Sequence, residues 1–136
     1  MINEKRGRVR IFKSKPFARF ARKARIDDAV LCDVIAGVEK GQIDADLGGG
    51  VIKQRIARPG GGKSGGFRAL ILIRLGTRAF FIDGFAKNER DNIRDDELQA
   101  LKKLASELLN YDDAALTKIL ATQFFTEVKC DDEAIS

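Results

Sequence analysis

Three apolar segments joined by short connections constrain the fold of this 136-residue chain more than any other feature. They cover residues 51–57, 67–75 and 78–85, and they are rich in the β-branched and aromatic residues that are typical of strands. Only Gly76 and Thr77 separate the last two segments, which indicates a tight turn. Parallel strands need a longer crossover, so we expect three consecutive antiparallel strands.

The residues before these strands predict one further strand and two helices. Residues 8–13 alternate between basic and apolar side chains, which indicates a strand with one buried face. A first helix is expected to begin near Pro16, and a second is expected to begin at Asp27 and to end at Gly41. The two helices are expected to form a hairpin. The glycine-rich residues 45–50 are expected to form a flexible turn.

The last third of the chain is predicted to be helical. Three acidic residues at 95–97 begin a segment whose leucines recur at helical spacing, and a shorter helix is expected from about 112 to 120. The whole pattern predicts an α+β fold, with a helical hairpin packed on a twisted, mainly antiparallel sheet and with C-terminal helices.

The chain is expected to form a single domain over residues 1–136. Its length allows one core that is large enough to fold alone. We expect that core at about 8–110, a C-terminal helical extension at about 111–128 and a frayed tail at 129–136.

The connection between the first two of the three strands contains a motif of nucleotide-binding proteins. Residues 57–64, ARPGGGKS, fit the loose form of the phosphate-binding loop. A true phosphate loop leads into a helix, whereas Gly65 and Gly66 lead here into a strand. We therefore expect no nucleotide cofactor. The loop is either a connection without function or, as we favour, a contact for phosphate groups of another ligand.

Composition excludes several kinds of site. The chain has no histidine, which excludes His-based triads and most zinc sites, and we expect no metal ion or other cofactor. Cys32 lies in an apolar helical pattern and Cys130 in an acidic tail, so neither suggests a disulfide framework. The chain also lacks an apolar run long enough to span a membrane and a signal-peptide apolar region. A cytoplasmic protein without membrane contact is expected.

The charge is distributed unevenly along the chain. Residues 1–25 contain ten Lys or Arg and one Glu, a net charge of +9, whereas residues 91–136 contain five basic and eleven acidic residues, a net charge of −6. This asymmetry favours a surface that faces a polyanion such as nucleic acid. The alternative is an ordinary solvated charged surface.

Three linked motifs resemble a known family. They are GGGVIKQRIA at residues 48–57, GKSGGFR at 62–68 and GFAKNER at 84–90. With the helical segments around them, from about Phe12 to Val128, they are similar to the RelE-type toxins of bacterial toxin–antitoxin modules, and most similar to the HigB branch. The resemblance implies a small RNase fold. It also implies an enzyme that cleaves messenger RNA, usually on the ribosome. It also implies a cognate antitoxin that covers or distorts the basic RNA-binding face.

The resemblance also implies which residues act. Lys53 and Arg55 match the basic pair on the strand before the loop, Arg68 matches the arginine after the Gly-aromatic step, and Lys87 matches the lysine after the last strand. Clustered cations can support RNA cleavage by its own 2′-hydroxyl without a metal. Lys53 is our candidate for the general base. The expected RNA-binding residues are Arg58, Lys63, Arg90, Arg94 and Phe67.

The chain departs from the better-known RelE members near its last motif. Asn88 and Arg94 stand where those members have an arginine and a tyrosine, which leaves the general acid and the base-stacking group open. Phe67 or Phe85 could stack on a base, but aromatic residues at strand spacing are more often part of the core.

Two other functions remain open at the level of sequence. One is a toxin without enzymatic activity that poisons gyrase, as in the ParE branch. The other is a simple nucleic-acid-binding module whose affinity comes from its basic residues. For Lys53 and Arg55 the alternative role is that of a solvated outer sheet face.

Overall fold

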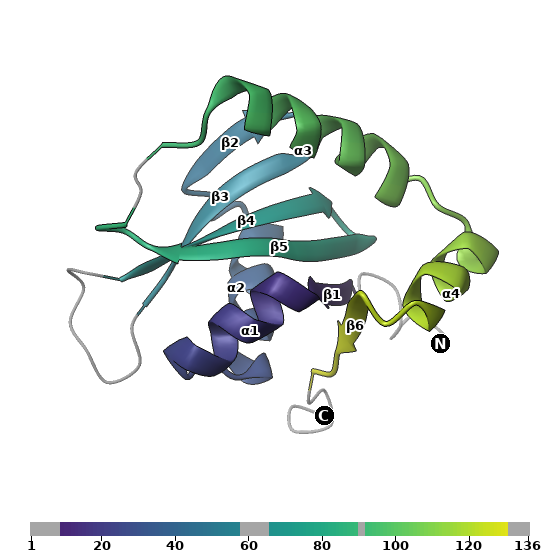
Figure 1. Cartoon of the computed structure of the whole chain (residues 1–136), viewed down its shortest axis with the longest axis horizontal. Coiled ribbons are helices and arrows are strands. Elements are labelled where there is room, and N and C mark those ends of the chain that lie inside the picture. Colours follow the sequence, from purple (N-terminus) through teal and green to yellow (C-terminus); the bar gives the residue numbers. More distant parts are fainter. Residues whose placement is uncertain (1–8, 58–65, 90–91, 131–136) are drawn as a thin grey trace.

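The structure is a computed structural model that describes residues 9–57, 66–89 and 92–130. Within these ranges, helices pack on a single six-stranded sheet (Figure 1). In chain order the elements are β1 (Arg10–Ser14), α1 (Lys15–Ala24), α2 (Asp28–Glu39), β2 (Ala45–Gly48), β3 (Val51–Ile56), β4 (Phe67–Arg74), β5 (Arg78–Ala86), α3 (Asp95–Leu108), α4 (Asp113–Ala121) and β6 (Phe125–Val128).

The predicted strand meander is confirmed and forms the centre of the sheet. Strands β3, β4 and β5 pair antiparallel in that order, and β2 adds to the outer edge of β3. On the other side, β1 pairs parallel with β5, and β6 pairs antiparallel with β1. The strand order is β2-β3-β4-β5-β1-β6. The sheet is therefore mainly antiparallel, and the α+β fold class is confirmed.

Helices cover both faces of the sheet. Helices α1 and α2 lie on one face, where Phe17, Leu31 and Ile35 are buried in the same cluster as sheet residues (Figure 1). Helix α3 and the shorter α4 cover the other face through residues such as Leu101 and Leu116. We call these two sides the α1 face and the α3 face. The α3 face is defined by the buried strand residues Phe12, Val51, Leu70, Leu72, Phe80, Phe85 and Phe125.

Side-chain caps explain where the first two helices begin. The Ser14 hydroxyl oxygen accepts the backbone N–H of Phe17 at 3.1 Å, and the same hydroxyl donates to the Ile82 carbonyl at 2.7 Å. A carboxylate oxygen of Asp27 accepts the backbone N–H of Val30 at 3.2 Å. The Asp27 cap lies where the sequence predicts the second helix to begin, and the Ser14 cap lies just before the helix expected near Pro16. The Ser14 hydroxyl also joins the start of α1 to β5.

Two segments differ from the prediction. Within residues 45–50, which the sequence predicts to be a flexible turn, Ala45–Gly48 forms strand β2 and only the following glycines turn the chain. The predicted helical extension at 111–128 contains helix α4, but Phe125–Val128 is a strand. It forms a strand because it pairs with the outer edge of β1, which lies more than a hundred residues earlier in the sequence. Of the predicted frayed tail, residues 131–136 lie outside the described ranges.

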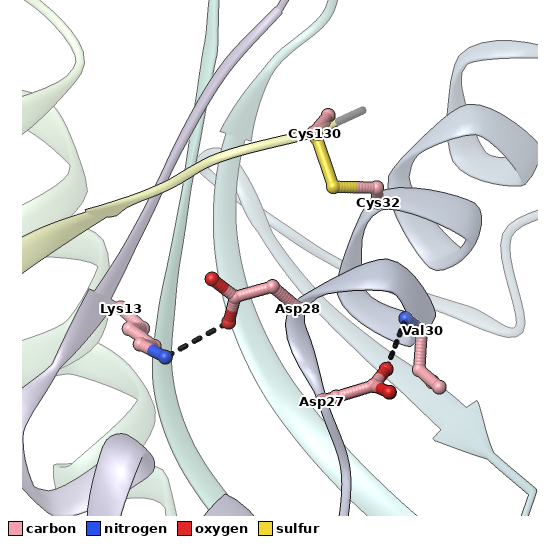
Figure 2. The surroundings of a disulfide bond; sticks show 6 residues. All are labelled: Lys13, Asp27, Asp28, Val30, Cys32 and Cys130. Carbon is pink, nitrogen blue, oxygen red and sulfur yellow. Dashed lines mark hydrogen bonds and ion pairs between the residues drawn. A yellow bond between two sulfur atoms is a disulfide. The ribbon is translucent and has the colours of Figure 1, made fainter. Parts of the chain in front are cut away.

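The two cysteines form a disulfide, although their sequence contexts did not suggest a disulfide framework. Cys32 on α2 and Cys130 after β6 are 98 residues apart in sequence, and their Cα atoms are 5.8 Å apart. Figure 2 shows this bond beside an ion pair of 2.9 Å between Lys13 on β1 and Asp28 on α2. The disulfide thus links helix α2 covalently to the segment after β6, and the ion pair links α2 to β1.

Candidate functional site

The basic residues of β3 and β4 come together on the α3 face. Residues alternate between the two faces along a strand, so Lys53 and Arg55 lie on the same side as the buried Val51. Arg68 shares this face with Leu70 on β4. In the β3–β4 pairing, Arg55 lies directly opposite Arg68. The structure therefore brings together three of the four predicted catalytic residues.

The fourth predicted residue, Lys87, lies at the same end of the sheet. It follows directly after β5, and its backbone N–H donates to the Gly66 carbonyl at 3.2 Å. Gly66 precedes Phe67, the first residue of β4 and the neighbour of Arg68. Four basic residues thus lie near this end of the sheet: Lys53 and Arg55 on β3, Arg68 on β4 and Lys87 after β5.

The guanidinium groups of Arg55 and Arg68 have no carboxylate partner among the described residues. Arg55 is exposed and Arg68 is half-buried. The Arg68 guanidinium donates to the carbonyl of Phe67 at 3.4 Å. Within the part of the chain that the structure describes, no carboxylate forms an ion pair with either arginine. Two adjacent arginines in this state are suited to bind the oxygens of a phosphate group.

An irregularity in β5 lies close to this site. The register between β4 and β5 shifts so that Leu70 lies opposite Asp83 and Ile71 lies opposite Phe81. Leu70 is also the partner of Lys53 on the other side, so one row across the sheet contains Lys53, Leu70 and Asp83. An Asp83 carboxylate oxygen accepts the backbone N–H of Gly84 at 2.9 Å, which supports the chain at the bulge.

Phe67, which the sequence offers as an RNA-binding residue or as part of the core, is a core residue in this structure. Phe67 has 9% of its surface exposed and lies on the α1 face, where its ring packs edge-to-face on Phe20 with centroids 5.4 Å apart. Because the side chain points away from Arg68, it serves the core. Phe85 lies on the α3 face directly opposite Arg68 but is also buried.

The remaining predicted RNA-binding residues are only partly described. Arg94 precedes α3, and its side chain donates to an Asp96 carboxylate oxygen at 3.2 Å. This hydrogen bond lowers the pKa of Asp96 below its usual value. Arg94 is exposed and, unlike Arg55, has a carboxylate partner among the described residues. Arg58, Lys63 and Arg90 lie outside the described residues.

The segment that resembles a nucleotide-binding loop joins two strands. Its described flanks belong to the antiparallel pair β3–β4, as the sequence predicts, so the described chain after this segment continues as a strand and not as the helix of a true phosphate loop. In the described ranges, no three His, Cys, Asp or Glu side chains are arranged to hold a metal ion. None of the described helices is long and apolar enough to cross a membrane.

Two polar residues near Arg55 went unnoticed in the sequence. Gln54 is buried on the α1 face between Ile52 and Ile56, and its side chain bonds to the segment before β2. In that segment, a carboxylate oxygen of Asp44 accepts the backbone N–H of Arg55 at 2.7 Å. The available signal was a glutamine at a position where the alternation calls for an apolar residue.

Comparison with known proteins identifies the family of this chain. Residues 9–128 match the family model described as the RelE toxin of the RelE/RelB toxin–antitoxin system. No curated protein matches the chain. The match covers all ten elements from β1 to β6, including the strands that carry Lys53, Arg55 and Arg68. The family is one of toxins that have an antitoxin partner, and this chain belongs to the RelE toxin family.

Proposed function

We propose that the chain is a metal-independent endoribonuclease that cleaves messenger RNA on the ribosome, inhibits translation and is neutralised by a cognate antitoxin. The observation that carries this proposal is the direct pairing of Arg55 with Arg68, with Lys53 on the same face. Family membership supports the toxin role. Its closer assignment to the HigB branch remains a prediction from the sequence motifs.

Each basic residue has a role in the proposed reaction. Lys53, in its neutral form, takes the proton of the RNA 2′-hydroxyl while that oxygen attacks the adjacent phosphorus. Arg55 and Arg68 stabilise the negative charge that grows on the phosphate oxygens. Lys87 or Arg90 gives a proton to the 5′-oxygen as its bond to phosphorus breaks. The products are a 2′,3′-cyclic phosphate and a 5′-hydroxyl.

The proposed place of action is the cytoplasm, where ribosomes and messenger RNA are found. Disulfides are rare in that compartment because thiol systems keep cysteines reduced. The Cys32–Cys130 bond lies on α2 and beyond β6, whereas the proposed catalytic residues lie on β3, on β4 and after β5. Cleavage is therefore expected from both the oxidised and the reduced protein.

The proposal is tested by inducing the chain in a bacterium and mapping new 5′ ends of messenger RNA. Lys53→Ala and Arg68→Ala are each expected to lower cleavage about 100-fold or more, since loss of one group that stabilises the transition state has effects of that order. Lys118→Ala on α4 is the matched control, because it removes one exposed positive charge away from the site.

Purified protein with message, with and without ribosomes, then decides whether the ribosome is required. If both site variants still cleave and stop growth, the assignment of the residues is wrong. DNA breaks without loss of transcripts would instead indicate a gyrase poison. Salt-dependent RNA binding without cleavage, even with ribosomes present, would indicate a simple binding module.

A further inference from the structure

Strand pairing at the outer edge of β3 stops before the site. Strand β2 begins at Ala45, which lies opposite Lys53, whereas β3 continues to Ile56. A continued antiparallel ladder would place residues 44 and 43 opposite Gln54 and Arg55. The chain leaves the sheet there instead. The end of β3 that carries Arg55 thus has β4 on one side, and on the other side no strand of the described residues pairs with it.

Three side-chain hydrogen bonds take the place of the missing ladder. The Gln54 amide oxygen accepts the backbone N–H of Asp44 at 2.7 Å, and the Gln54 amide nitrogen donates to the Gln42 carbonyl at 3.2 Å. In return, a carboxylate oxygen of Asp44 accepts the backbone N–H of Arg55 at 2.7 Å. Residues 42–44 are therefore fixed against the end of β3, and the Arg55 backbone is fixed by them.

The burial of Gln54 indicates that these bonds are specific. Its exposed fraction is 5%, and its neighbours on the same face of β3, Ile52 and Ile56, are buried at 2% and 1%. A buried amide is costly unless both its oxygen and its nitrogen find partners. Gln54 finds both in residues 42–44, so its side chain holds that segment instead of filling the core.

The site needs such a restraint because Arg55 lies opposite Arg68. Like charges at directly opposite positions of an antiparallel pair repel each other and favour separation of the strands. The Asp44 carboxylate binds the backbone of Arg55, and no carboxylate of the described residues pairs with its guanidinium. The strand end is held while the charged group stays available to phosphate.

We propose that Asp44 and Gln54 are positioning residues for Arg55, which keep its guanidinium beside that of Arg68 for binding the scissile phosphate. This inference rests on the proposed RNA cleavage. Removing the Asp44 carboxylate frees the Arg55 amide, and the strand end moves away from Arg68 under their repulsion. Displacements of about 1 Å in a catalytic group can lower rates about 100-fold.

The test compares cleavage constants and amide exchange in purified variants. Asp44→Ala is expected to lower kcat for RNA cleavage about 10- to 100-fold with a smaller change in KM, because the misplaced group acts on the transition state. Asp44→Asn keeps an oxygen that can accept the Arg55 N–H, and it is expected to restore most of the activity. Gln54→Leu should resemble Asp44→Ala.

Asp46→Ala is the matched control. Asp46 also accepts a backbone N–H through its carboxylate, that of Gly48 at 2.9 Å, but it does so at the far end of β2. Its replacement should leave both kcat and the hydrogen exchange of the Arg55 amide unchanged. In Asp44→Ala, by contrast, the Arg55 amide should lose its protection from exchange.

A double-variant cycle separates positioning from general loss of structure. In an Arg55→Ala background, Asp44→Ala is expected to lower kcat no further, because its effect passes through Arg55. Two outcomes overturn the inference although the wild type cleaves RNA. In one, Asp44→Ala lowers kcat as much in the Arg55→Ala background as it does alone. In the other, Asp44→Ala alone leaves kcat unchanged. If the wild type cleaves no RNA, the proposed function fails, and with it the catalytic role of Asp44 and Gln54.

Discussion

The α3 face carries arginines at both ends of the sheet, and the two groups differ in their partners. At one end, Arg74, Arg78 and Arg10 lie side by side on β4, β5 and β1, in register with one another. At the other end, Arg55 and Arg68 lie opposite each other on β3 and β4. Alternation along the strands places all five on the same face.

Every arginine of the first group is bound to another part of the protein. Arg74 donates to the side chain of Asn110, and Arg10 forms an ion pair of 2.9 Å with Glu127. The buried Arg78 donates to the carbonyls of Leu108 and Tyr111 at 3.1 and 2.8 Å, where α3 ends. Burial, followed by the charges of Arg10 and Arg74, lowers the pKa of Arg78.

The comparison shows how to distinguish structural arginines from those that face a ligand. Both groups contain neighbouring like charges, which cost stability. In the first group, hydrogen bonds to carbonyls and carboxylates offset this cost. In the second group, the backbone is fixed at Arg55, but no carboxylate of the described residues pairs with the guanidinium groups. The first group should therefore control stability and the second should control activity.

The disulfide should give the largest effect on stability, and it acts at the end of the sheet that carries the first group. Replacing Cys32 and Cys130 together by serine is expected to lower the free energy of unfolding by about 2–4 kcal/mol. Denaturant unfolding of the oxidised wild type and of the double variant measures this difference. Hydrogen exchange should accelerate in β6 and β1 and stay unchanged at Arg55. Equal acceleration at both ends would contradict the division into two regions.

Replacing Arg78 should have the next largest effect. Arg78→Met leaves two carbonyl oxygens at the end of α3 without their donor, and loss of hydrogen bonds from a charged group costs about 2–3 kcal/mol. The matched variant Arg55→Met removes the repulsion between Arg55 and Arg68, so it should raise the free energy of unfolding slightly and not lower it. Both are measured by urea denaturation. A larger loss for Arg55→Met would reverse the roles of the two groups.

Gly84→Ala tests how far the site depends on the α1 face. A Cβ atom at Gly84 would lie 2.3 Å from a ring carbon of Phe20, which itself packs on Phe67. The ring must move, at an expected cost of about 1–3 kcal/mol for overpacking. Thermal unfolding measures the loss, and cleavage assays show whether the shift reaches Arg68. Unchanged stability would mean that α1 yields without strain.

The smallest effect concerns pH and the Arg10–Glu127 pair. The hydrogen bond from Arg10 lowers the pKa of Glu127 below its usual 4.5. A carboxyl group with a lowered folded-state pKa contributes stability above that usual value and loses it as the pH falls through the folded-state pKa. The contribution should stay below about 1 kcal/mol, because both side chains are partly exposed. Unfolding of wild type and Glu127→Gln at pH 7 and pH 3 should show a smaller acid loss in the variant.

The sequence predicted those features that depend on local periodicity. Alternation alone placed Lys53 and Arg55 on one face, and the short connections predicted the meander. It could not predict that Arg68 lies opposite Arg55, because the register passes through a glycine-rich connection of unknown shape. The hydrogen bonds by which Asp44 and Gln54 hold the end of β3 depend on the point where β2 begins. The sequence did not predict β2, because the glycines at 48–50 indicated a turn.

Contacts between distant parts of the chain were also beyond the sequence. No local pattern indicates that β1 lies parallel to β5 or that β6 completes the sheet beside it. Phe125–Val128 is too short to be distinguished from the end of a helix by periodicity. Without β6 in place, Cys130 had no predicted position near Cys32, and the disulfide could not be foreseen.

The position of β1 between β5 and β6 has a consequence for synthesis of the protein. Strand β1 is synthesised first, but it cannot pair until β5 has been translated. Its other neighbour, β6, is translated later still. Such pairing between distant segments raises contact order and slows folding. A nascent chain that already contains Lys53, Arg55 and Arg68 therefore still has an unpaired edge at β1. This edge is paired only when β6 has been synthesised.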